Sequence, residues 1–291
     1  MEKNSGRRGS GTALLLIVCG CVLLALCLHL HRMIQTRADQ PEETAAPTEP
    51  AALPSPEPTP ASTPAPEVTP PPGPLVVIDP GHQLHGDFGQ EPIGPGALET
   101  KARVTDGTQG VVTGIYEYEL NLAVSLLLRD ELEARGYRVV LTREENDVSL
   151  SNAERAAIAN DLQADAFVRI HANGVDDSSV RGIMTICMSA QNPYNAALYS
   201  SSRSLADALL RSLGEALACD ENHRSLWETD SMSGINYSLV PVCIVEMGYM
   251  SNPEEDRLLA DGDYRQTIAR GLADGLDAWF AAGRESGETE R

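Results

Sequence analysis

Apolar residues in this 291-residue chain are arranged in two ways from residue 75 onward. Some form short continuous runs that end at turn or charged residues, which is the pattern of buried β-strands. These predicted strands are LVVID (75–79), YRVVLT (137–142), AFVRI (166–170), GIMTICM (182–188) and VPVCIVE (240–246).

Between these runs the apolar residues recur every three or four positions, as they do on one face of a helix. In residues 117–135 this face holds Leu120, Val124, Leu128 and Leu132. Further helices are predicted over residues 151–162, 196–218 and 264–281. Strands that alternate with helices predict a single α/β domain at residues 75–281, with a twisted, largely parallel sheet flanked by helices.

The N-terminal region has a third pattern. A short basic tail, residues 1–12, precedes an almost wholly apolar segment at residues 13–30. The length of this segment is near the lower limit for spanning a bilayer. A cleaved signal peptide has the same order of charged and apolar residues, but no convincing small-residue cleavage site follows. We therefore predict a single-pass membrane anchor with the folded domain outside the cell, or a secreted protein if the segment is cleaved.

Residues 31–74 have the composition of a disordered linker. Of the 19 prolines in the chain, 13 lie between Pro41 and Pro74, among Ala, Thr, Ser and Glu. Proline removes backbone donors, and few large apolar groups are present to offset the entropy of ordering. Such a segment is an extended, semi-rigid spacer that would hold a domain away from a membrane. Residues 282–291 are predicted to be a disordered C-terminal tail.

Composition excludes two classes of site. The formal net charge is -20 and the sequence pI is about 4.6, with no basic stripe of the kind that binds a phosphate backbone, so nucleic-acid binding is not expected. The cysteines of the folded region are far apart and form no CxxC pair. Neither a disulfide framework nor a Cys-rich zinc site is indicated, and we expect Cys187, Cys219 and Cys243 to be small buried side chains.

Candidate catalytic residues follow the predicted strands. His82 and His171 lie at the carboxyl ends of the first strand and of AFVRI, and Glu246 ends VPVCIVE. Open α/β sheets place their active sites at this edge. Glu117 begins a predicted helix after a long loop and is able to join them. Two histidines and a carboxylate form a familiar catalytic zinc set with a fourth position for water, and a second carboxylate can transfer the protons. From position alone, ordinary polar roles for these residues remain open.

Four sequence motifs favour the zinc site over ordinary polar roles for these residues. IDPGH (78–82), EYELNL (117–122), RIHAN (169–173) and VEMGYMSNPEED (245–256) occur in an order that resembles the zinc-dependent N-acetylmuramoyl-L-alanine amidases of the amidase-3 family. The resemblance covers residues 75–281 and implies a catalytic amidase domain of α/β fold. The implied reaction cleaves the amide between N-acetylmuramic acid and L-alanine in peptidoglycan.

The same resemblance implies roles for individual residues. His82, Glu117 and His171 would bind one Zn²⁺ ion, and Glu246 would be the catalytic glutamate. Glu119 and Glu99 are local rivals of Glu117, although the Asn-Leu pair at 121–122 favours Glu117.

Other polar residues have simpler interpretations. Arg169 stands where many members of the family have a small serine, which is expected to alter substrate contacts. His85 and His223 are expected in a solvent-facing loop and on the surface. The segment from Gln83 to Tyr116 is too long for a simple connection, and we expect it to line the substrate groove.

The leading functional hypothesis is therefore an amidase that remodels the bacterial cell wall. Its expected partner is peptidoglycan, its membrane contact is through the N-terminal segment, and its catalytic domain is expected to be monomeric. Two alternatives remain open: a zinc peptidase that cuts within the stem peptides, and a non-catalytic wall-binding protein of the same fold.

Overall fold

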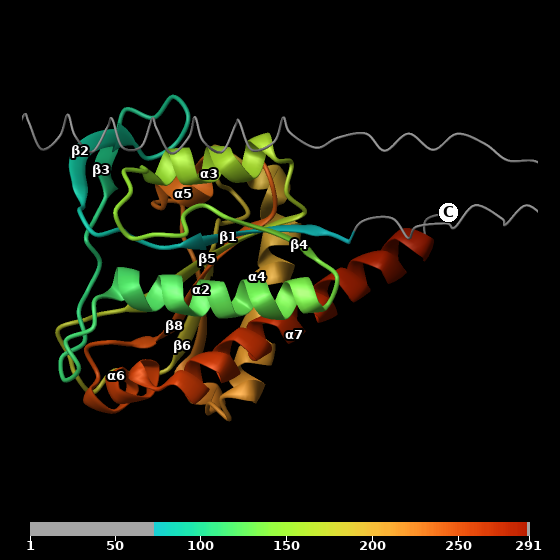
Figure 1. Ribbon diagram of the computed structural model, residues 1–291. Coiled ribbons are helices and arrows are strands. Elements are labelled where there is room, and N and C mark those ends of the chain that lie inside the picture. The colour runs from blue at the N-terminus through green and yellow to red at the C-terminus, as the bar shows by residue number, and fades with distance from the viewer. Residues whose placement is uncertain (1–72, 290–291) are drawn as a thin grey trace, which may run out of the picture. The chain divides into compact units, whose positions relative to one another are not determined.

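Six strands form a mixed sheet in the order β4-β1-β5-β8-β6-β7 (Figure 1). The computed structural model describes residues 73–289. Every neighbouring pair of strands is parallel except β6 and β8, which pair antiparallel. The strands are β1 Leu75–Pro80, β4 Arg138–Leu141, β5 Ala166–Asn173, β6 Ile183–Cys187, β7 Arg224–Glu228 and β8 Val242–Tyr249.

Helices cover both faces of this sheet. One face carries α2 (Glu117–Ala134), α4 (Tyr199–Ala216) and α7 (Gly262–Thr289), and the other carries α3 (Asn152–Asp161) and α5 (Ser233–Asn236) (Figure 1). This layering confirms the predicted α/β domain with a largely parallel sheet. The remaining helical segments are α6 (Pro253–Ala260), η1 (Ala196–Leu198) and η2 (Glu221–His223).

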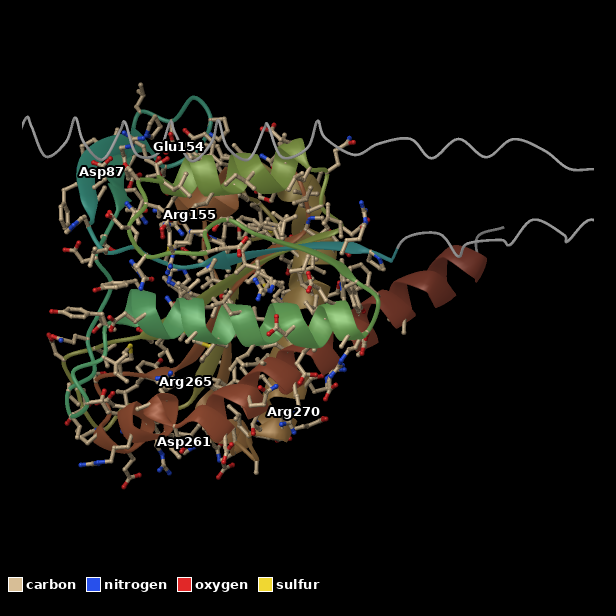
Figure 2. All side chains as sticks on the ribbon, viewed as in Figure 1. Asp87, Glu154, Arg155, Asp261, Arg265 and Arg270 are labelled. Carbon is tan, nitrogen blue, oxygen red and sulfur yellow. The ribbon has the colours of Figure 1, made fainter. Side chains whose placement is uncertain are left out.

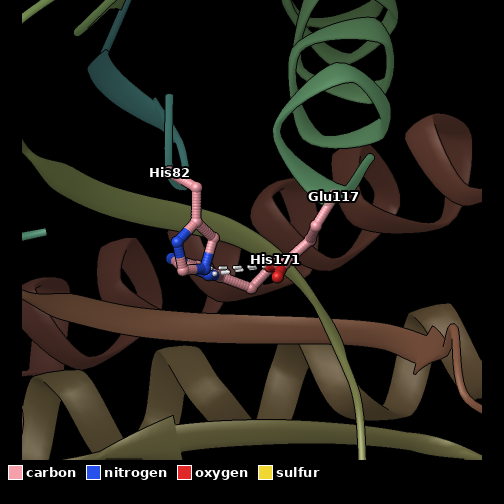
Figure 3. A group of neighbouring side chains, drawn as sticks. All are labelled: His82, Glu117 and His171. Atoms are coloured by element: carbon pink, nitrogen blue, oxygen red, sulfur yellow. Dashed lines mark hydrogen bonds and ion pairs between the residues drawn. The ribbon is translucent and has the colours of Figure 1, made fainter. Parts of the chain in front are cut away.

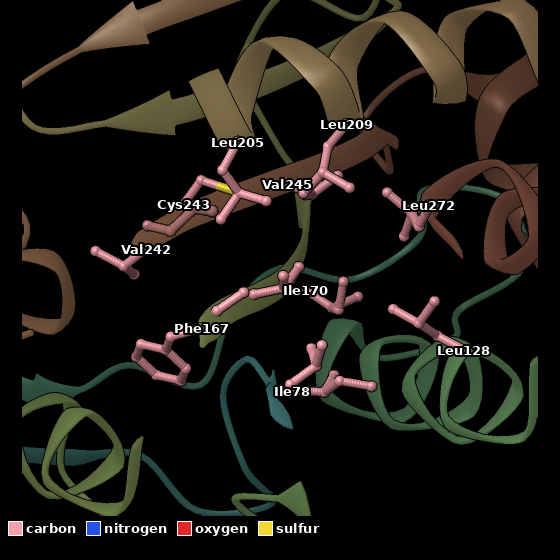
Figure 4. Close-up of a cluster of buried hydrophobic side chains, with 14 of the residues drawn as sticks. Ile78, Leu128, Phe167, Ile170, Leu205, Leu209, Val242, Cys243, Val245 and Leu272 are labelled. Atoms are coloured by element: carbon pink, nitrogen blue, oxygen red, sulfur yellow. The ribbon is translucent and has the colours of Figure 1, made fainter. Parts of the chain in front are cut away.

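The main hydrophobic core lies between the sheet and the α2, α4 and α7 layer. Ile78, Ile170 and Val245 of the three central strands face Leu128 of α2 and Leu209 of α4 (Figure 4). All five side chains are fully buried. Because helices cover both faces, the central strands are apolar on both sides, which is why they appear in the sequence as continuous runs and not as alternating patterns.

The sequence pattern did not predict three strands. β2 (Asp87–Pro92) and β3 (Thr100–Val104) form a separate antiparallel hairpin inside the segment that we expected to be a long loop. Most of their residues are at least partly exposed, so the hairpin lacks an apolar period. The edge strand β7 has the same polar character and pairs only with β6.

The ends of the chain differ from the sequence predictions in one respect. α7 continues to Thr289, whereas a tail was predicted from residue 282. Residues 282–289 contain no proline, and the helix continues through Gly283 and Gly287 although glycine disfavours a helix interior. The predicted basic tail, the anchor at 13–30 and nearly all of the linker at 31–74 lie outside the described residues. Within residues 73–289, no helix is long and apolar enough to cross a membrane.

Candidate active site

The ends of neighbouring strands bring the predicted polar residues together. His82 directly follows the turn after β1, and His171 lies in β5, which pairs with β1. Glu246 lies in β8 directly opposite His171 in the β5–β8 register. Glu117 is the first residue of α2, and its side chain reaches the two imidazoles (Figure 3).

The three side chains of His82, Glu117 and His171 are spaced to hold one metal ion. His82 Nε2 and His171 Nδ1 each lie 3.2 Å from Glu117 Oε1, and one candidate ligand atom from each residue lies within 4.8 Å of the others. Two ligands bound to one tetrahedral zinc ion at ordinary bond lengths lie about 3.4 Å apart. The observed separations therefore fit a single ion of that size.

The two ring nitrogens of His82 have different partners, and Nε2 is the one that faces Glu117. Nδ1 lies 2.8 Å from the carbonyl oxygen of Thr105. A carbonyl only accepts hydrogen bonds, so Nδ1 carries a proton, and Nε2 faces Glu117 either with the lone pair of a neutral ring or with the N–H of a protonated one. A lone pair facing a carboxylate requires a cation between them, either a proton or a metal ion. Metal-binding histidines in proteins commonly have this arrangement.

The pKa of each imidazole follows from the same contacts. Burial lowers the pKa of His82, but the charge and hydrogen bond of Glu117 outweigh it, and the pKa is raised above its usual value. His171 is more strongly desolvated, and burial lowers its pKa to about 4 despite its hydrogen bond to Glu117. At neutral pH His171 is therefore uncharged and able to donate a lone pair to a metal ion.

Glu117 is held as an ionised carboxylate by its surroundings. Its Oε2 accepts a hydrogen bond from the backbone N–H of Thr108 at 2.9 Å, and its Oε1 accepts from Asn121 Nδ2 at 3.1 Å and from Ala172 N at 3.2 Å. Burial alone would raise the pKa of Glu117, but the two histidines hold it well below its usual range. A buried carboxylate with this many donors remains charged.

The rival carboxylates are elsewhere. Glu119 is exposed and accepts a hydrogen bond from Tyr116 N at the start of α2. Glu99 is also exposed, near the tip of the β2–β3 hairpin. Among the three candidate glutamates, the structure brings only Glu117 to the two histidines.

Close backbone approach explains the glycines in this region. A Cβ on Gly81 would clash with the imidazole of His171. Gly107 has a φ of +83°, and a Cβ there would lie 2.7 Å from Glu117 Oε2. His82 itself has a φ of 58°, a left-handed conformation that is uncommon outside glycine and costs on the order of 1–3 kcal/mol. The backbone of His82 is therefore held in place by its neighbours.

Buried arginines supply that restraint. Arg155 on α3 donates to the carbonyl oxygens of Pro80 at 2.8 Å and His82 at 2.9 Å. Arg143 donates to the carbonyl oxygens of Pro80 and Gly81 at 2.9 and 3.0 Å. Together they fix the turn that carries His82. Neither arginine was predicted from the sequence as part of the site.

Asp79 links these arginines to the sheet. Its carboxylate accepts from Arg155 Nη1 and Arg169 Nε, both at 2.8 Å, and from Thr142 Oγ1 at 2.5 Å. Burial raises the pKa of Asp79, but the two guanidinium groups lower it by a larger amount. The pKa of Asp79 therefore lies well below its usual range. Asp79 therefore has a structural role under the site, and it is the shared anion of Arg155 and Arg169.

The long final motif also has a structural role. Asn252 caps α6 by accepting from Glu254 N and Glu255 N, and the acidic run at 254–256 forms the first turn of that helix. The carboxylate of Asp256 then accepts from Val112 N at 2.6 Å and Thr113 N at 2.8 Å. These contacts hold the loop that leads into α2, and so they help to position Glu117.

Glu246 faces a pocket of about 210 Å³ that His82 and His171 also line. Its Oε2 is buried and has no hydrogen-bond partner within the described part of the chain. Burial raises the pKa of Glu246 to about 8, with a further contribution from Glu117, while Arg169 opposes the shift. A carboxyl group that titrates near neutral pH is suited to accept and donate a proton.

The remaining candidates from the sequence take no part in this site. His85 is exposed, and His223 lies in η2, near Arg181. Cys187 and Cys243 are buried and Cys219 is partly exposed, and all three are free thiols.

Known proteins share the fold and the motifs. A sequence model described as N-acetylmuramoyl-L-alanine amidase, of the amidase-3 type, matches residues 76–278. The chain is 33% identical over 217 residues to N-acetylmuramoyl-L-alanine amidase Rv3717 of Mycobacterium tuberculosis, a match that covers 72% of this chain and 87% of the relative.

Solved structures give the same result. The crystal structure of the amidase Ami1 from Mycobacterium smegmatis has a TM-score of 0.65 at 29% identity and covers 72% of this chain and 98% of that one. The catalytic domain of the amidase CwlV from Bacillus (Paenibacillus) polymyxa has a TM-score of 0.56 at 27% identity, covering 72% and 98% of the two chains. These matches confirm the predicted family and enzyme class: the chain belongs to the N-acetylmuramoyl-L-alanine amidase family of the amidase-3 type.

Proposed function

We propose that this enzyme hydrolyses the amide between N-acetylmuramic acid and L-alanine in peptidoglycan, with one zinc ion bound by His82, Glu117 and His171. The observation that carries the proposal is the convergence of two imidazole nitrogens on one oxygen of Glu117, each at 3.2 Å. When the His82 ring is neutral its nitrogen presents a lone pair there, and a cation, either a proton or a metal ion, is required between the two groups. Family membership supports the same substrate and reaction.

The charges of the site suit a divalent cation. Two neutral imidazoles and one carboxylate carry a single negative charge, so a doubly charged ion is only partly neutralised and stays an effective Lewis acid. Zinc in such a site activates water and polarises the substrate carbonyl. Four side chains outside the ligand set keep the ligands oriented, because they hold the turn that carries His82 and the loop that leads to Glu117. They are Arg143, Arg155, Asp79 and Asp256.

Glu246 is the proton carrier in this proposal. It accepts a proton from the attacking water and delivers it to the amine of L-alanine as the amide bond breaks. Its position opposite His171 on the neighbouring strand and its unpartnered buried oxygen support this role. A carboxylate fully engaged in hydrogen bonds or ion pairs would have no free oxygen to offer.

The alternatives are distinguished by the bond that is cut. The full-length protein, supplied with zinc, is incubated with purified peptidoglycan and the products are identified by mass spectrometry. The amidase releases whole stem peptides with a new L-alanine amino end and leaves bare lactyl carboxyl groups on the glycan. A zinc peptidase would leave amino acids attached to muramic acid, and a wall-binding protein would sediment with the wall without releasing any fragment.

We also propose that the enzyme acts outside the cytoplasm, where peptidoglycan lies. The apolar segment at 13–30 would anchor it and the proline-rich residues 31–74 would serve as a spacer, while the catalytic domain acts as a monomer. Fractionation of cells that express the full-length chain tests this arrangement. The protein should sediment with membranes, and removal of residues 1–30 should release it into the soluble fraction.

A further inference from the structure

The pocket beside Glu246 has a cationic side. Lys101 of the β2–β3 hairpin and Arg169 of β5 both line it, together with Asn152 and Ser233. Arg169 precedes His171 by two residues on the same strand, so both side chains project from the same face of the sheet. Two positive side chains therefore lie in the pocket that holds the proposed catalytic groups.

The charge of Arg169 is only partly neutralised. Its Nε donates to Asp79, and its Nη2 donates to Asn152 Oδ1 at 2.7 Å. Asp79 also pairs with Arg155, so one carboxylate serves two guanidinium groups. The third nitrogen, Nη1, donates to no residue in the described part of the chain, and it lies against Gly234, where a Cβ would clash with it.

Lys101 has no anionic partner of its own. It is the only lysine at residues 73–289 in a chain with a net charge of -20. Its Nζ donates to the carbonyl oxygen of Ser231 at 3.3 Å and lies 3.9 Å from Met232 Sδ, and it forms no ion pair with any residue in that range. The opposing charges that act on it are those of Glu91 and Glu99, and neither carboxylate forms an ion pair with it. One of the three ammonium donors is therefore free of any hydrogen bond to the described residues.

A buried hydroxyl completes the polar lining. Ser233 is 1% exposed, its Oγ has no hydrogen-bond partner among the described residues, and the side chain lines the same pocket. A buried hydroxyl without a partner is uncommon in a folded protein, since it loses its hydrogen bonds to water. With Lys101 and Arg169 beside it, this hydroxyl is placed to donate to an anion.

We propose that Lys101 and Arg169 bind a carboxylate of the substrate next to the scissile amide. This inference rests on the proposed function. In a stem peptide L-alanine is followed by a D-glutamyl residue that is linked onward through its side chain, so its α-carboxyl group is either free or amidated. The Cα atoms of these two residues are about 3.8 Å apart, which keeps the α-carboxyl group near the bond to be cut. The enzyme therefore prefers stems in which this group is a free carboxylate.

The experiment compares two synthetic N-acetylmuramoyl peptides that differ only in whether the α-carboxyl group of the second residue is free or amidated. The full-length, zinc-loaded enzyme should cleave the free acid with a kcat/KM roughly 10–100-fold higher, as expected when charge-assisted hydrogen bonds are exchanged for neutral ones. Substitution of Arg169 is a poor first test because it leaves Asp79 with one partner fewer in the buried network.

Lys101→Met is the informative variant, because Lys101 forms no ion pair that holds the fold. It should lower kcat/KM for the acid by about tenfold and leave that for the amide within about twofold. Arg103→Met is the matched control. Arg103 lies on the same strand but pairs with Asp87 and Glu154 outside the pocket (both labelled in Figure 2). The preference of this variant for the free acid over the amide should therefore persist.

Equal rates on the two substrates in the wild-type enzyme would overturn the inference, as would an equal loss on both substrates in Lys101→Met. Preference for the amide would also overturn it. If neither peptide nor whole peptidoglycan yields the expected amine, the proposed function fails, and this inference fails with it. Cleavage of whole peptidoglycan and of both peptides at equal rates leaves the function intact and refutes only the carboxylate preference.

Discussion

The Nε2 atom of His82 faces Glu117 Oε1 at 3.2 Å, while the opposite ring nitrogen donates to the carbonyl oxygen of Thr105. His82 and Glu117 come from different elements, the turn after β1 and the start of α2. Without a cation between them the two acceptors repel. The contact therefore indicates that the protein is built around a positive charge at this point.

Gly107 provides a test of how closely the backbone must approach the ligands. Its φ is +83°, and a Cβ there would crowd both Glu117 Oε2 and the ring of His82. Gly107→Ala should weaken zinc binding about tenfold or more, measured by competition with a chelator of known affinity. Gly96→Ala is the matched control, since its φ of +78° imposes a similar backbone strain but nothing lies within 4 Å of the added methyl group. Equal effects of the two substitutions would show that backbone strain alone is responsible.

Glu246→Gln tests the proton carrier separately from the metal. The substitution keeps the shape of the side chain but removes its ability to accept a proton, so the rate of amide hydrolysis should fall about 10²–10⁴-fold. The zinc content should stay at the wild-type level, because Glu246 is not among the three proposed ligands. Release of stem peptides from peptidoglycan at the wild-type rate would remove Glu246 from the mechanism.

Asp79→Asn tests the buried cluster under the site. Removal of the carboxylate leaves Arg155 and Arg169 without their shared anion and should lower the free energy of unfolding by about 3–5 kcal/mol at pH 7. The guanidinium groups hold the pKa of Asp79 below its usual value in the folded state. The contribution of the carboxylate is therefore complete above about pH 4, the usual pKa of an unfolded Asp, and declines as the pH falls below that value.

Urea unfolding of both proteins between pH 7 and pH 3 measures this dependence. The difference in stability between wild type and Asp79→Asn should be constant from pH 7 to about pH 5 and narrow below pH 4. A difference that stays the same down to pH 3 would mean that the ionised carboxylate does not stabilise the fold.

Much of the site could be predicted from the chain because its residues follow apolar strands. His82 follows β1, and His171 and Glu246 lie in the carboxyl-terminal halves of β5 and β8, parallel strands whose carboxyl ends meet at one edge of the sheet. The sequence offered Glu119 as an alternative ligand to Glu117, since both lie in the segment YEYEL at residues 116–120. Only the family motif favoured Glu117. The structure places Glu117 beside the histidines because it is buried at the start of α2, where Glu119 is exposed.

The cationic residues around the site could not be predicted in the same way. Arg155 lies on an amphipathic helix, where an arginine usually faces solvent, and its partner Asp79 is 76 residues away in the sequence. Lys101 lies on a polar hairpin that has no apolar period, so neither the strand nor the direction of its side chain was evident. Both residues acquire their roles only from contacts between distant segments.

The most direct test of the central claim is the zinc content of the purified full-length protein, measured by plasma mass spectrometry after extensive dialysis. Wild type should retain one zinc ion per chain, and His82→Ala and His171→Ala should each retain almost none while Glu119→Ala retains the wild-type amount. A wild-type protein without zinc, or histidine variants that keep it, would contradict the proposed metal site.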